Sequence, residues 1–588
     1  PSHRPAIFLL AAMQRLRRVD SFEQVELAGL FRGISIAQVL TSQAIVFAGG
    51  LSSVVGAGAS ISTKDKFDSE FASTEKVNEV DIFISHTWTS DRWLKYAALC
   101  FDLNFHLALG VSITTWMAVI GFLVMGGIST WGGSRYLVLA GVYAPTLLFF
   151  IVFFFGHKLI SFIHKLPTVW LDKACIHQTN ELMKAHQVNA LPIFVARSRR
   201  MLVLWSDSLF ERLWCNLELA IFAKHGPFDR LNFAPLWLTP WLLISMLLDL
   251  VSTSTLEFLE IMIPNWTAFF MGPLDELFAN AFHLEEGSRA AGCFAALAIW
   301  CLSGLCYLPT SIPGCVAFRR KVCSHKLMLE QMSQFDIRAA KCTVASDRQL
   351  IEHQVVELWA EPTFSPDDGF EVFQTPSPED REEALDRFNA YIRGPLKAAV
   401  VKGLGHEAHV PYHLCVIAFL PMNFYSLVNT LGCDSGPCET SAKSAVFDSV
   451  EWYLGAQAIA WLLCLFLAFP LTHPVLLRLI SLAMSHSEGH FQSLLVVLCC
   501  PLAYAYSYIC GGLIWGMVFV SVQDYSPDWL LALLFYLAFL VAQTILIFRP
   551  PNLGHLPDVM KCTCAGRQVV VQWEEVRPML PTRNEDGH

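Results

Sequence analysis

The sequence predicts an α-helical polytopic membrane protein of about eight spans with an α/β domain that a hairpin of two spans interrupts. The first observation is compositional: 54% of the 588 residues are hydrophobic and only 16% are charged, whereas soluble domains carry about 25% charged residues. The second is that eight apolar stretches are long enough to cross a hydrocarbon core of about 30 Å. The third is that short apolar runs alternate with helical patterns around the first two stretches, as in parallel sheets covered by helices.

The eight apolar stretches are the expected membrane spans. They cover residues 106–130, 136–156, 233–252, 290–318, 411–431, 452–472, 491–522 and 529–548. The seventh is longer than a bilayer requires, so it must tilt, kink near Pro501 or Gly511-Gly512, or extend beyond the membrane. A ninth stretch, residues 33–63, is uncharged but rich in Ala, Gly and Ser, and its composition leaves open whether it spans. Residues 257–282 mix acids, prolines and aromatics, so we expect them at the membrane interface.

Basic residues indicate which ends of the spans face the cytosol. The Lys and Arg residues that flank one side are Lys158, Lys165, Arg319, Arg320, Lys321, Lys397, Lys402, Arg478 and Arg549. The positive-inside rule makes that side cytosolic. The opposite side holds an acidic loop with a glycosylation sequon at Asn265, and also Cys433 and Cys438, which could form a disulfide there. Because of the spans, the lipid bilayer is an expected partner. Because of the basic flanks, the α/β domain is expected in the cytosol.

These features divide the chain into a series of parts. They are an N-terminal region that contains the ninth stretch (1–79), a split α/β domain (80–105 and 157–232), the inserted hairpin (106–156), a pair of spans with the acidic loop (233–318), a helical cytosolic domain (319–410), a four-span domain (411–548) and a cytosolic tail (549–588). In the helical domain, Ser377-Pro378 predicts a helix start and Gly394-Pro395 predicts the matching stop. The net charge of −10 gives no reason to expect nucleic acid as a partner.

Three strings define the α/β domain. They are V-D-I-F-I-S-H at residues 80–86, W-L-D-K-A-C-I-H-Q at residues 170–178, and L-W-C-N-L-E-L at residues 213–219. We expect residues 81–85, 169–171 and 201–205 to form neighbouring parallel strands in one sheet, with a short last strand at 231–234. Helices are expected at residues 91–105, 181–195 and 210–223. The first of these would run directly into the membrane.

The order of the three strings resembles the Toll/interleukin receptor (TIR) domain, and the middle string also resembles the fungal heterokaryon-incompatibility (HET) domain. The resemblance covers about 100 residues of the chain. It implies a flavodoxin-like parallel sheet and a signalling function by domain association, with self-association or other TIR-like domains as partners and no required cofactor.

The same resemblance implies an enzymatic alternative centred on Glu218. TIR-family NAD hydrolases carry a glutamate in W-C-x-x-E-L or similar strings, and residues 214–219 match this string. In those enzymes NAD is the substrate and the glutamate engages the nicotinamide ribose, where a carboxylate stabilises the developing positive charge. Ligands of doubly wound sheets bind at the carboxyl ends of the strands. The residues expected to line that crevice are Ser85, His86, Trp88, Asp172, Lys173 and Ser206.

Two further observations bear on these alternatives. The loop at residues 173–179 lacks the Gly-rich segment that would close over a dinucleotide, which favours association over catalysis. His86 and His177 are interpreted as hydrogen-bonded loop histidines, so no metal site is expected. A channel or transporter with a regulatory TIR-like domain is a third interpretation. Asp249 is the only carboxylate clearly inside an expected span, near one of its ends, and ion pathways usually contain more such groups.

Overall fold

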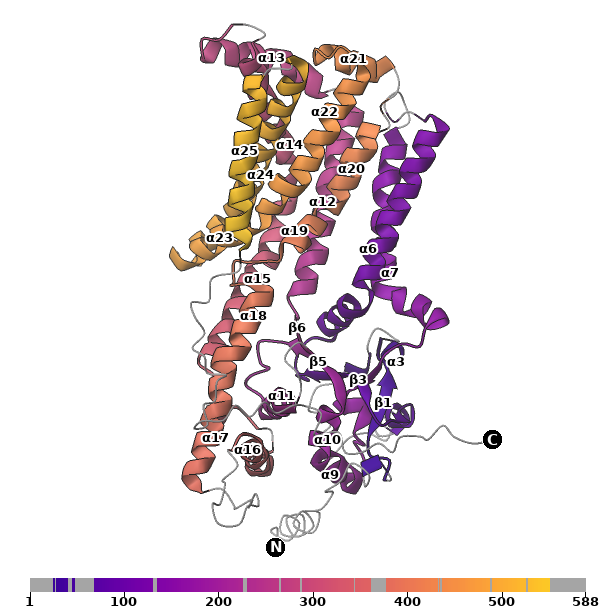
Figure 1. Cartoon of the computed structure of the whole chain (residues 1–588), viewed down its shortest axis with the longest axis vertical. Helices are drawn as coiled ribbons and strands as arrows, with labels where there is room; N and C mark the ends of the chain where they lie inside the picture. Colours follow the sequence, from indigo (N-terminus) through magenta and orange to yellow (C-terminus); the bar gives the residue numbers. More distant parts are fainter. Residues whose placement is uncertain are drawn as a thin grey trace, which may run out of the picture. The chain divides into compact units, whose positions relative to one another are not determined.

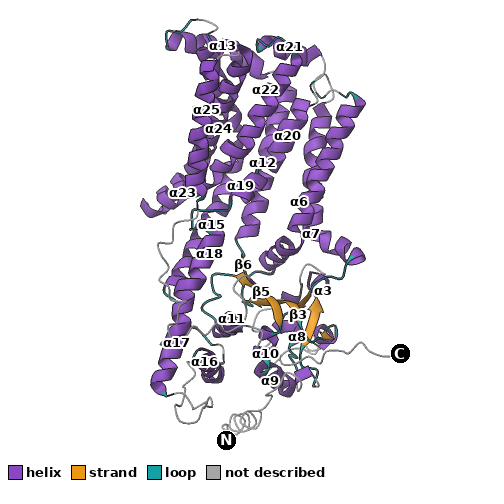
Figure 2. Ribbon diagram, viewed as in Figure 1, coloured by secondary structure: helices purple, strands orange, loops and turns teal. Residues whose placement is uncertain are grey.

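The computed structural model describes most of the chain outside its two termini. The described residues are 25–26, 28–40, 45–47, 68–128, 130, 135–225, 230–263, 266–285, 288–342, 344–360, 377–431, 433, 436–486, 489–524 and 527–549. The expected glycosylation site Asn265 and the tail from residue 550 lie outside them. Long helices and one small sheet make up the described chain (Figures 1 and 2).

The number of membrane-length helices agrees with the sequence. Seven helices in the described part of the chain are long and apolar enough to cross a membrane, or eight when the bent pair α19 (Tyr412–Ala418) and α20 (Leu420–Leu431) is counted as one span. The two halves of this pair meet at an angle of 58°. Pro421 explains the break, because proline lacks the N–H of a continuous helix and its ring clashes with the carbonyl four residues earlier.

The third span differs from the expectation. Residues Leu231–Pro235 form strand β6 of the sheet, so helix α12 begins only at Leu238 and continues to Met262. Asp249 consequently lies in the middle of this helix and not near an end. Glu257, which the sequence placed at the interface, is buried within the same helix. Residues 233–235 therefore form a strand of the sheet, although their apolar character had predicted the start of a membrane span.

The remaining spans contain local departures from a straight α-helix. Helix α14 (Arg289–Gly304) passes through a 3₁₀ turn into α15 (Leu308–Ser333), which extends far beyond the expected end at residue 318. Helix α22 (Val450–Leu463) is joined to α23 (Thr472–His486) by a π-turn and a 3₁₀ turn at residues 464–471. Helices α24 (Gly489–Asp524) and α25 (Pro527–Phe548) complete the bundle.

The sheet confirms the expected strand pairing. Its order is β2-β1-β4-β3-β5-β6, in which β3 (Val80–His86) pairs in parallel with both β4 (Thr168–Trp170) and β5 (Ser198–Trp205). Strand β6 adds a further parallel strand beside β5. When these four parallel strands are numbered along the chain, their order across the sheet is second, first, third, fourth. This is the strand order of flavodoxin-like doubly wound sheets.

The sequence did not predict the antiparallel edge of the sheet. Strands β1 (Arg32–Ser35) and β2 (Glu75–Lys76) extend it beyond β4. The start of the ninth apolar stretch thus belongs to the sheet, followed by α3 (Ile36–Leu40) and the 3₁₀ turn η2 (Ile45–Phe47). Residues 41–44 and 48–63 of that stretch lie outside the described residues.

The helices of the α/β unit also differ in detail. The expected helix at residues 181–195 is two helices, α9 (Glu181–Asn189) and α10 (Leu191–Ala196), because Pro192 suits the first turn of a new helix. Helix α11 (Leu213–His225) starts later than expected. The residue before it, Arg212, instead forms a β-bridge with Lys341, which joins the unit to the 319–410 region.

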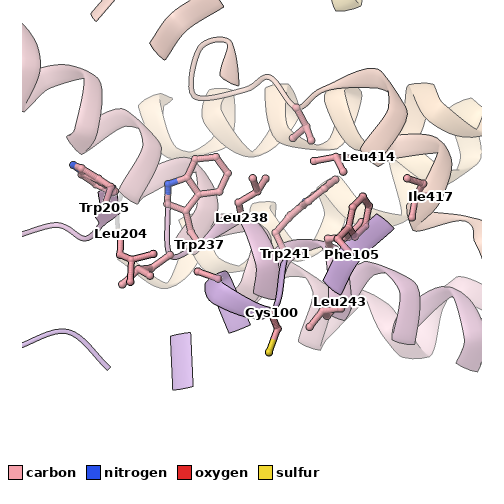
Figure 3. Close-up of a cluster of buried hydrophobic side chains, with 14 of the residues drawn as sticks. Cys100, Phe105, Leu204, Trp205, Trp237, Leu238, Trp241, Leu243, Leu414 and Ile417 are labelled. Atoms are coloured by element: carbon pink, nitrogen blue, oxygen red, sulfur yellow. The ribbon is translucent and has the colours of Figure 1, made fainter. Parts of the chain in front are cut away.

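Helix α6 (Arg92–Gly126) connects the sheet to the long apolar helices as one uninterrupted helix of 35 residues. It packs against α7 (Arg135–Ile163), and the Tyr96 hydroxyl and the Asn104 amide donate hydrogen bonds to backbone carbonyls of that helix at 2.8 and 2.9 Å. The apolar core is continuous across this region. Figure 3 shows Phe105 of α6 near Trp241 of α12 and Leu414 of α19, with Trp237 nearer to Leu204 of β5.

In the 319–410 region, the predicted helix start is confirmed and the predicted helix stop is wrong. Ser377 caps α17 (Pro378–Tyr391) in a capping box with Asp380, as the sequence indicates. The Gly394-Pro395 stop is wrong, because a π-turn at Ile392–Leu396 carries the helix onward into α18 (Lys397–Leu404). The wider π-turn accommodates a proline that an α-helix would not. The helix ends instead at Gly405, whose φ of 77° suits glycine.

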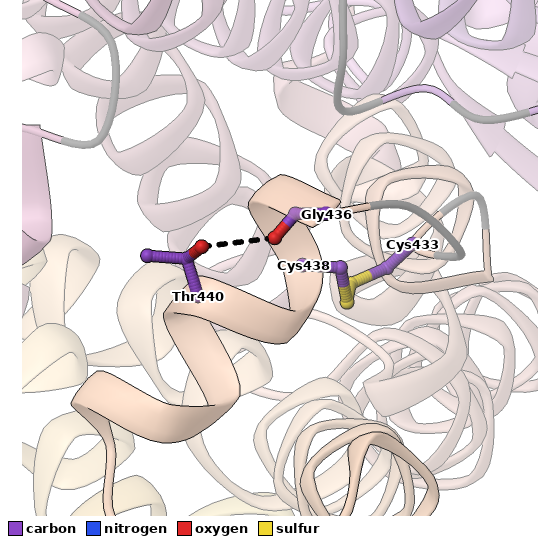
Figure 4. Close-up of a disulfide and its surroundings, with 4 residues drawn as sticks. All are labelled: Cys433, Gly436, Cys438 and Thr440. Atoms are coloured by element: carbon purple, nitrogen blue, oxygen red, sulfur yellow. Dashed lines mark hydrogen bonds between the residues drawn. A yellow bond between two sulfur atoms is a disulfide. The ribbon is translucent and has the colours of Figure 1, made fainter.

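A disulfide joins Cys433 to Cys438 between α20 and α21 (Gly436–Ser444), as Figure 4 shows. It closes a short loop at the end of the helices opposite to the sheet (Figure 1).

Candidate functional site

The expected site residues gather at one edge of the sheet. Ser85 and His86 end strand β3, Asp172 follows β4 at the start of the short helix α8 (Asp172–Cys175), and Ser206 follows β5. Strand β4, which follows β3 along the chain, pairs with one side of β3, and the next strand, β5, pairs with its other side. The carboxyl ends of β3 and β5 therefore form the topological switch point, where doubly wound sheets bind ligands.

Glu218 faces this switch point from α11. Its Oε2 accepts a hydrogen bond of 2.6 Å from the Ser85 hydroxyl, and only 9% of the residue is exposed. Burial raises the pKa of the Glu218 carboxyl to about 8, and the hydrogen bond from Ser85 opposes this shift. The carboxyl is consequently protonated in much of the population at neutral pH.

Asp172 holds the other side of the site. Its Oδ2 accepts a hydrogen bond of 2.6 Å from the Trp88 indole, and its Oδ1 accepts one of 2.7 Å from the backbone N–H of Lys173. Burial raises the pKa of Asp172, although these hydrogen bonds favour the charged form. His86 Nε2 lies 4.0 Å from Asp172 Oδ1. Burial and nearby cations lower the pKa of His86, so the imidazole in this contact is neutral at neutral pH.

The two remaining expected residues are also present at this edge. The Ser206 hydroxyl lies 2.7 Å from the hydroxyl of Thr87, which directly follows β3. The Lys173 ammonium lies 5.6 Å from the centre of the Trp88 ring. The structure therefore brings all seven expected residues to one edge of the sheet. His177 lies elsewhere in a loop, where its Nδ1 accepts a hydrogen bond from the backbone N–H of Asn180.

Three further residues at this edge were not predicted from the sequence. Lys95 of α6 is fully buried, and no described residue accepts a hydrogen bond from its ammonium. Phe47 of η2 covers it, with the ring centre 5.2 Å from Lys95 Nζ and 5.1 Å from the centre of the His86 ring. Arg212 is close enough to influence the pKa values of His86 and Asp172. Lys95 follows Asp91 by four residues, so its spacing resembled an ordinary exposed helix pair.

The chemistry of the edge is that of a polar, mostly buried cluster of basic and acidic side chains. Three basic side chains, Lys95, Lys173 and Arg212, lower the pKa of His86. The acidic side chains are Asp172, which is hydrogen-bonded, Asp91, which acts on Lys95, and Glu218, which readily holds a proton. When Glu218 is ionised it can stabilise positive charge that develops on a substrate. Within the described ranges, no three His, Cys, Asp or Glu side chains are grouped to hold a metal ion.

No protein-family model, curated protein or solved structure matches this chain. Function must therefore be inferred from the arrangement of its residues.

Proposed function

We propose that the chain is a multi-pass membrane signalling protein whose TIR-like domain lies in the cytosol and acts by associating with domains of its own kind. The order of its four parallel strands supports the TIR-like assignment. So does the position of the W-C-N-L-E-L string, because it brings Glu218 of α11 to the carboxyl edge of the sheet.

The continuity of α6 is the observation that carries this proposal. Its first turns cover the sheet, and the same helix continues through its apolar part to Gly126. On the other side, only two residues separate strand β6 from α12. A domain held by helices without flexible linkers keeps one orientation relative to the membrane. Copies in the same membrane would then meet with matching faces, which removes much of the orientational barrier to association.

The cytosolic location rests on charge and on the disulfide. Lys158 lies in the last turns of α7, which leads into strand β4 of the sheet, whereas the Cys433–Cys438 disulfide includes a residue of α21, at the opposite end of the bundle in Figure 1. Basic residues favour the cytosolic side and disulfides the opposite one. Cysteine-accessibility and glycosylation mapping should place residues 265 and 377 on opposite sides of the membrane. Finding both on one side would refute this topology.

Energy transfer between copies tests the association itself. Donor and acceptor fluorophores attached at the C-terminus would be reconstituted together in vesicles at low protein density. We expect transfer above the level calculated for randomly distributed proteins, and unlabelled protein should reduce it by competition. Transfer that only follows the density would contradict association.

NAD cleavage is the second candidate function, because Glu218 and Ser85 meet at the switch point. In this mechanism Ser85 orients the carboxyl, and the ionised Glu218 stabilises positive charge on the ribose as nicotinamide leaves. Glu218→Gln keeps the size of the side chain and removes the charge. If the domain is an enzyme, this change should slow nicotinamide release by roughly 100-fold, about 3 kcal/mol.

A matched variant controls that assay. Glu211 lies just before α11 and pairs with Lys341 at the surface, so Glu211→Gln should leave the rate within about twofold. The assay needs protein concentrated on vesicles as well as protein in detergent, because TIR-like enzymes often require assembly. No nicotinamide release by the wild type in either format would exclude the enzymatic candidate.

Transport is not proposed. Asp249, the acid in the middle of α12, has both carboxylate oxygens engaged by protein donors, Tyr307 and Met422. This arrangement serves the packing of the helices rather than an ion in transit.

A further inference from the structure

We propose that Lys95 anchors a binding site for the phosphate of a soluble ligand at the carboxyl edge of the sheet, and that the ring of Phe47 occupies this site in the structure. The inference goes beyond domain association and does not require NAD cleavage.

The buried ammonium of Lys95 is the first observation. A charged group without a hydrogen-bond partner is unfavourable in a protein interior, so buried charges are normally paired and hydrogen-bonded. Lys95 has no exposed surface, and within the described ranges its Nζ has no hydrogen-bond partner. Two acids, Asp172 and Asp91, act on Lys95 by their charge, but Asp172 is already engaged by the Trp88 indole and the backbone of Lys173. Burial lowers the pKa of Lys95 to about 8, and the charges of Asp172 and Asp91 oppose this shift. The side chain is therefore still mostly charged at neutral pH, although no described group accepts a hydrogen bond from it.

The surroundings of Lys95 are the second observation. Lys173 and Arg212 belong to the same cluster, and all three cations act on the His86 imidazole. The hydroxyls of Thr87 and Ser206 lie beside them at the strand ends. Several cations with hydroxyl donors suit a ligand with more than one negative charge, and phosphate is the common biological group of this kind. The switch point is also where doubly wound sheets bind their ligands.

Phe47 supplies the third observation. Its ring contacts both Lys95 and His86, although η2 is not one of the strand–helix units that build the sheet. The face of an aromatic ring partly compensates an ammonium ion, so Phe47 substitutes for the missing anion. A phosphate that binds Lys95 must displace this ring. Removing the ring should therefore strengthen phosphate binding, which a merely structural contact would not predict.

Pyrophosphate binding to the full chain in nanodiscs tests the proposal. The readout is the shift of the thermal unfolding midpoint across a titration. We expect Phe47→Ala to bind pyrophosphate at least tenfold more tightly than the wild type. Lys95→Met should abolish the shift, both alone and combined with Phe47→Ala, whereas Lys95→Arg should retain it within a few fold. The matched control is Lys76→Met on the exposed edge strand β2, which should bind like the wild type.

The same variants separate a ligand site from a structural role. If Lys95 is kept for a ligand, Lys95→Met without pyrophosphate should unfold at the wild-type temperature or above it, because the variant removes an unpartnered charge. A clearly lower midpoint would assign Lys95 a structural role and overturn the proposal. Pyrophosphate binding by the Phe47→Ala, Lys95→Met double variant that equals binding by Phe47→Ala would also overturn it.

Two further arms identify the source of the phosphate and keep the result independent of catalysis. Phosphoinositide added to the nanodiscs should give no Lys95-dependent stabilisation, and such stabilisation would overturn the assignment to a soluble ligand. Glu218→Gln should still bind pyrophosphate, since the probe contains no nicotinamide ribose. A protein that binds pyrophosphate through Lys95 but releases no nicotinamide from NAD would support this inference while excluding the enzymatic candidate.

Discussion

Asp249 of α12 accepts a hydrogen bond of 2.9 Å from the backbone N–H of Met422, at the start of the second half of the broken helix α19–α20. Pro421 breaks this helix, and the break leaves backbone N–H groups of α20 without partners in the preceding turn. The buried carboxylate satisfies one of them, while its other oxygen accepts a hydrogen bond of 2.6 Å from the Tyr307 hydroxyl. One acidic side chain thus joins three segments of the helical bundle.

Asp249→Ala should destabilise the protein by about 2–4 kcal/mol, because it leaves a buried N–H and a buried hydroxyl without acceptors. Asp249→Asn should cost less, since its amide oxygen can still accept one of the two hydrogen bonds. Thr255→Ala on the same helix is the control, because that hydroxyl bonds only the Val251 carbonyl of its own helix. Unfolding free energies in nanodiscs measure the effect, and a wild-type value for Asp249→Ala would contradict it.

Tyr412 compensates for a second proline. Pro470 has no N–H to offer the Phe466 carbonyl four residues earlier, and the Tyr412 hydroxyl donates to that carbonyl at 2.7 Å. We expect Tyr412→Phe to cost about 1 kcal/mol in the wild type. In a Pro470→Ala background the cost should fall below about 0.3 kcal/mol, because alanine can supply the missing donor. Equal costs in the two backgrounds, measured as a double-mutant cycle, would show that the two residues are not coupled.

Neighbouring arginines of β5 provide a matched pair for testing the link between the sheet and α6. Arg200 forms two hydrogen bonds, of 2.9 and 2.6 Å, with Asp102 of α6, whose side chain is only 14% exposed. Arg199 instead pairs with Glu79 where both side chains are more than half exposed. Arg200→Met should cost about 1.5–3 kcal/mol, and Arg199→Met less than about 0.5 kcal/mol. Both are measured by chemical unfolding.

Lysine at position 200 should not restore the wild-type stability, since a single ammonium cannot reproduce a bidentate contact. Full recovery in Arg200→Lys would mean that charge alone, and not the paired geometry, holds α6 to the sheet.

The sequence predicted those parts of the fold that local patterns determine. The strands at residues 81–85, 169–171 and 201–205 are apolar runs with short polar ends, and they pair as predicted. The membrane helices follow from length and apolar composition. Residues 233–235 fit both a strand and a span, and hydrogen bonding to β5 decided between them. Gly394-Pro395 has the local chemistry of a helix stop, but the surrounding helices α17 and α18 continue through a π-turn.

The candidate site was predictable only where its residues follow strand ends. Ser85, Asp172 and Ser206 meet because the carboxyl ends of parallel strands share one edge of the sheet. Lys95 and Phe47 reach the site from a helix and from a distant 3₁₀ turn. No spacing in the sequence relates Phe47 to Lys95, because η2 precedes β3 along the chain and their contact depends on the tertiary fold.

The last prediction concerns the proton on Glu218. Its pKa rises from an ordinary value near 4.5 to about 8 on folding, so the native state binds a proton that the unfolded state releases between these values. The stabilisation from this group is therefore complete below about pH 4.5 and is lost as the pH rises through 8. Within that window the unfolding free energy attributable to Glu218 should fall by up to about 1.4 kcal/mol per pH unit.

Glu218→Gln isolates this contribution, because glutamine stays neutral and can still accept the hydrogen bond from Ser85. The wild type should become progressively less stable relative to the variant from pH 5 to pH 8, with little further change above pH 9. Glu211→Gln, whose carboxylate is exposed, should follow the wild-type pH profile. The measurement is the unfolding midpoint in nanodiscs at half-unit pH intervals. A constant difference between wild type and Glu218→Gln would mean that Glu218 is ionised throughout. In that case the rate of any NAD cleavage through this carboxylate would not depend on its deprotonation. The burial of Glu218 instead predicts that the rate of NAD cleavage rises with pH as the carboxyl loses its proton.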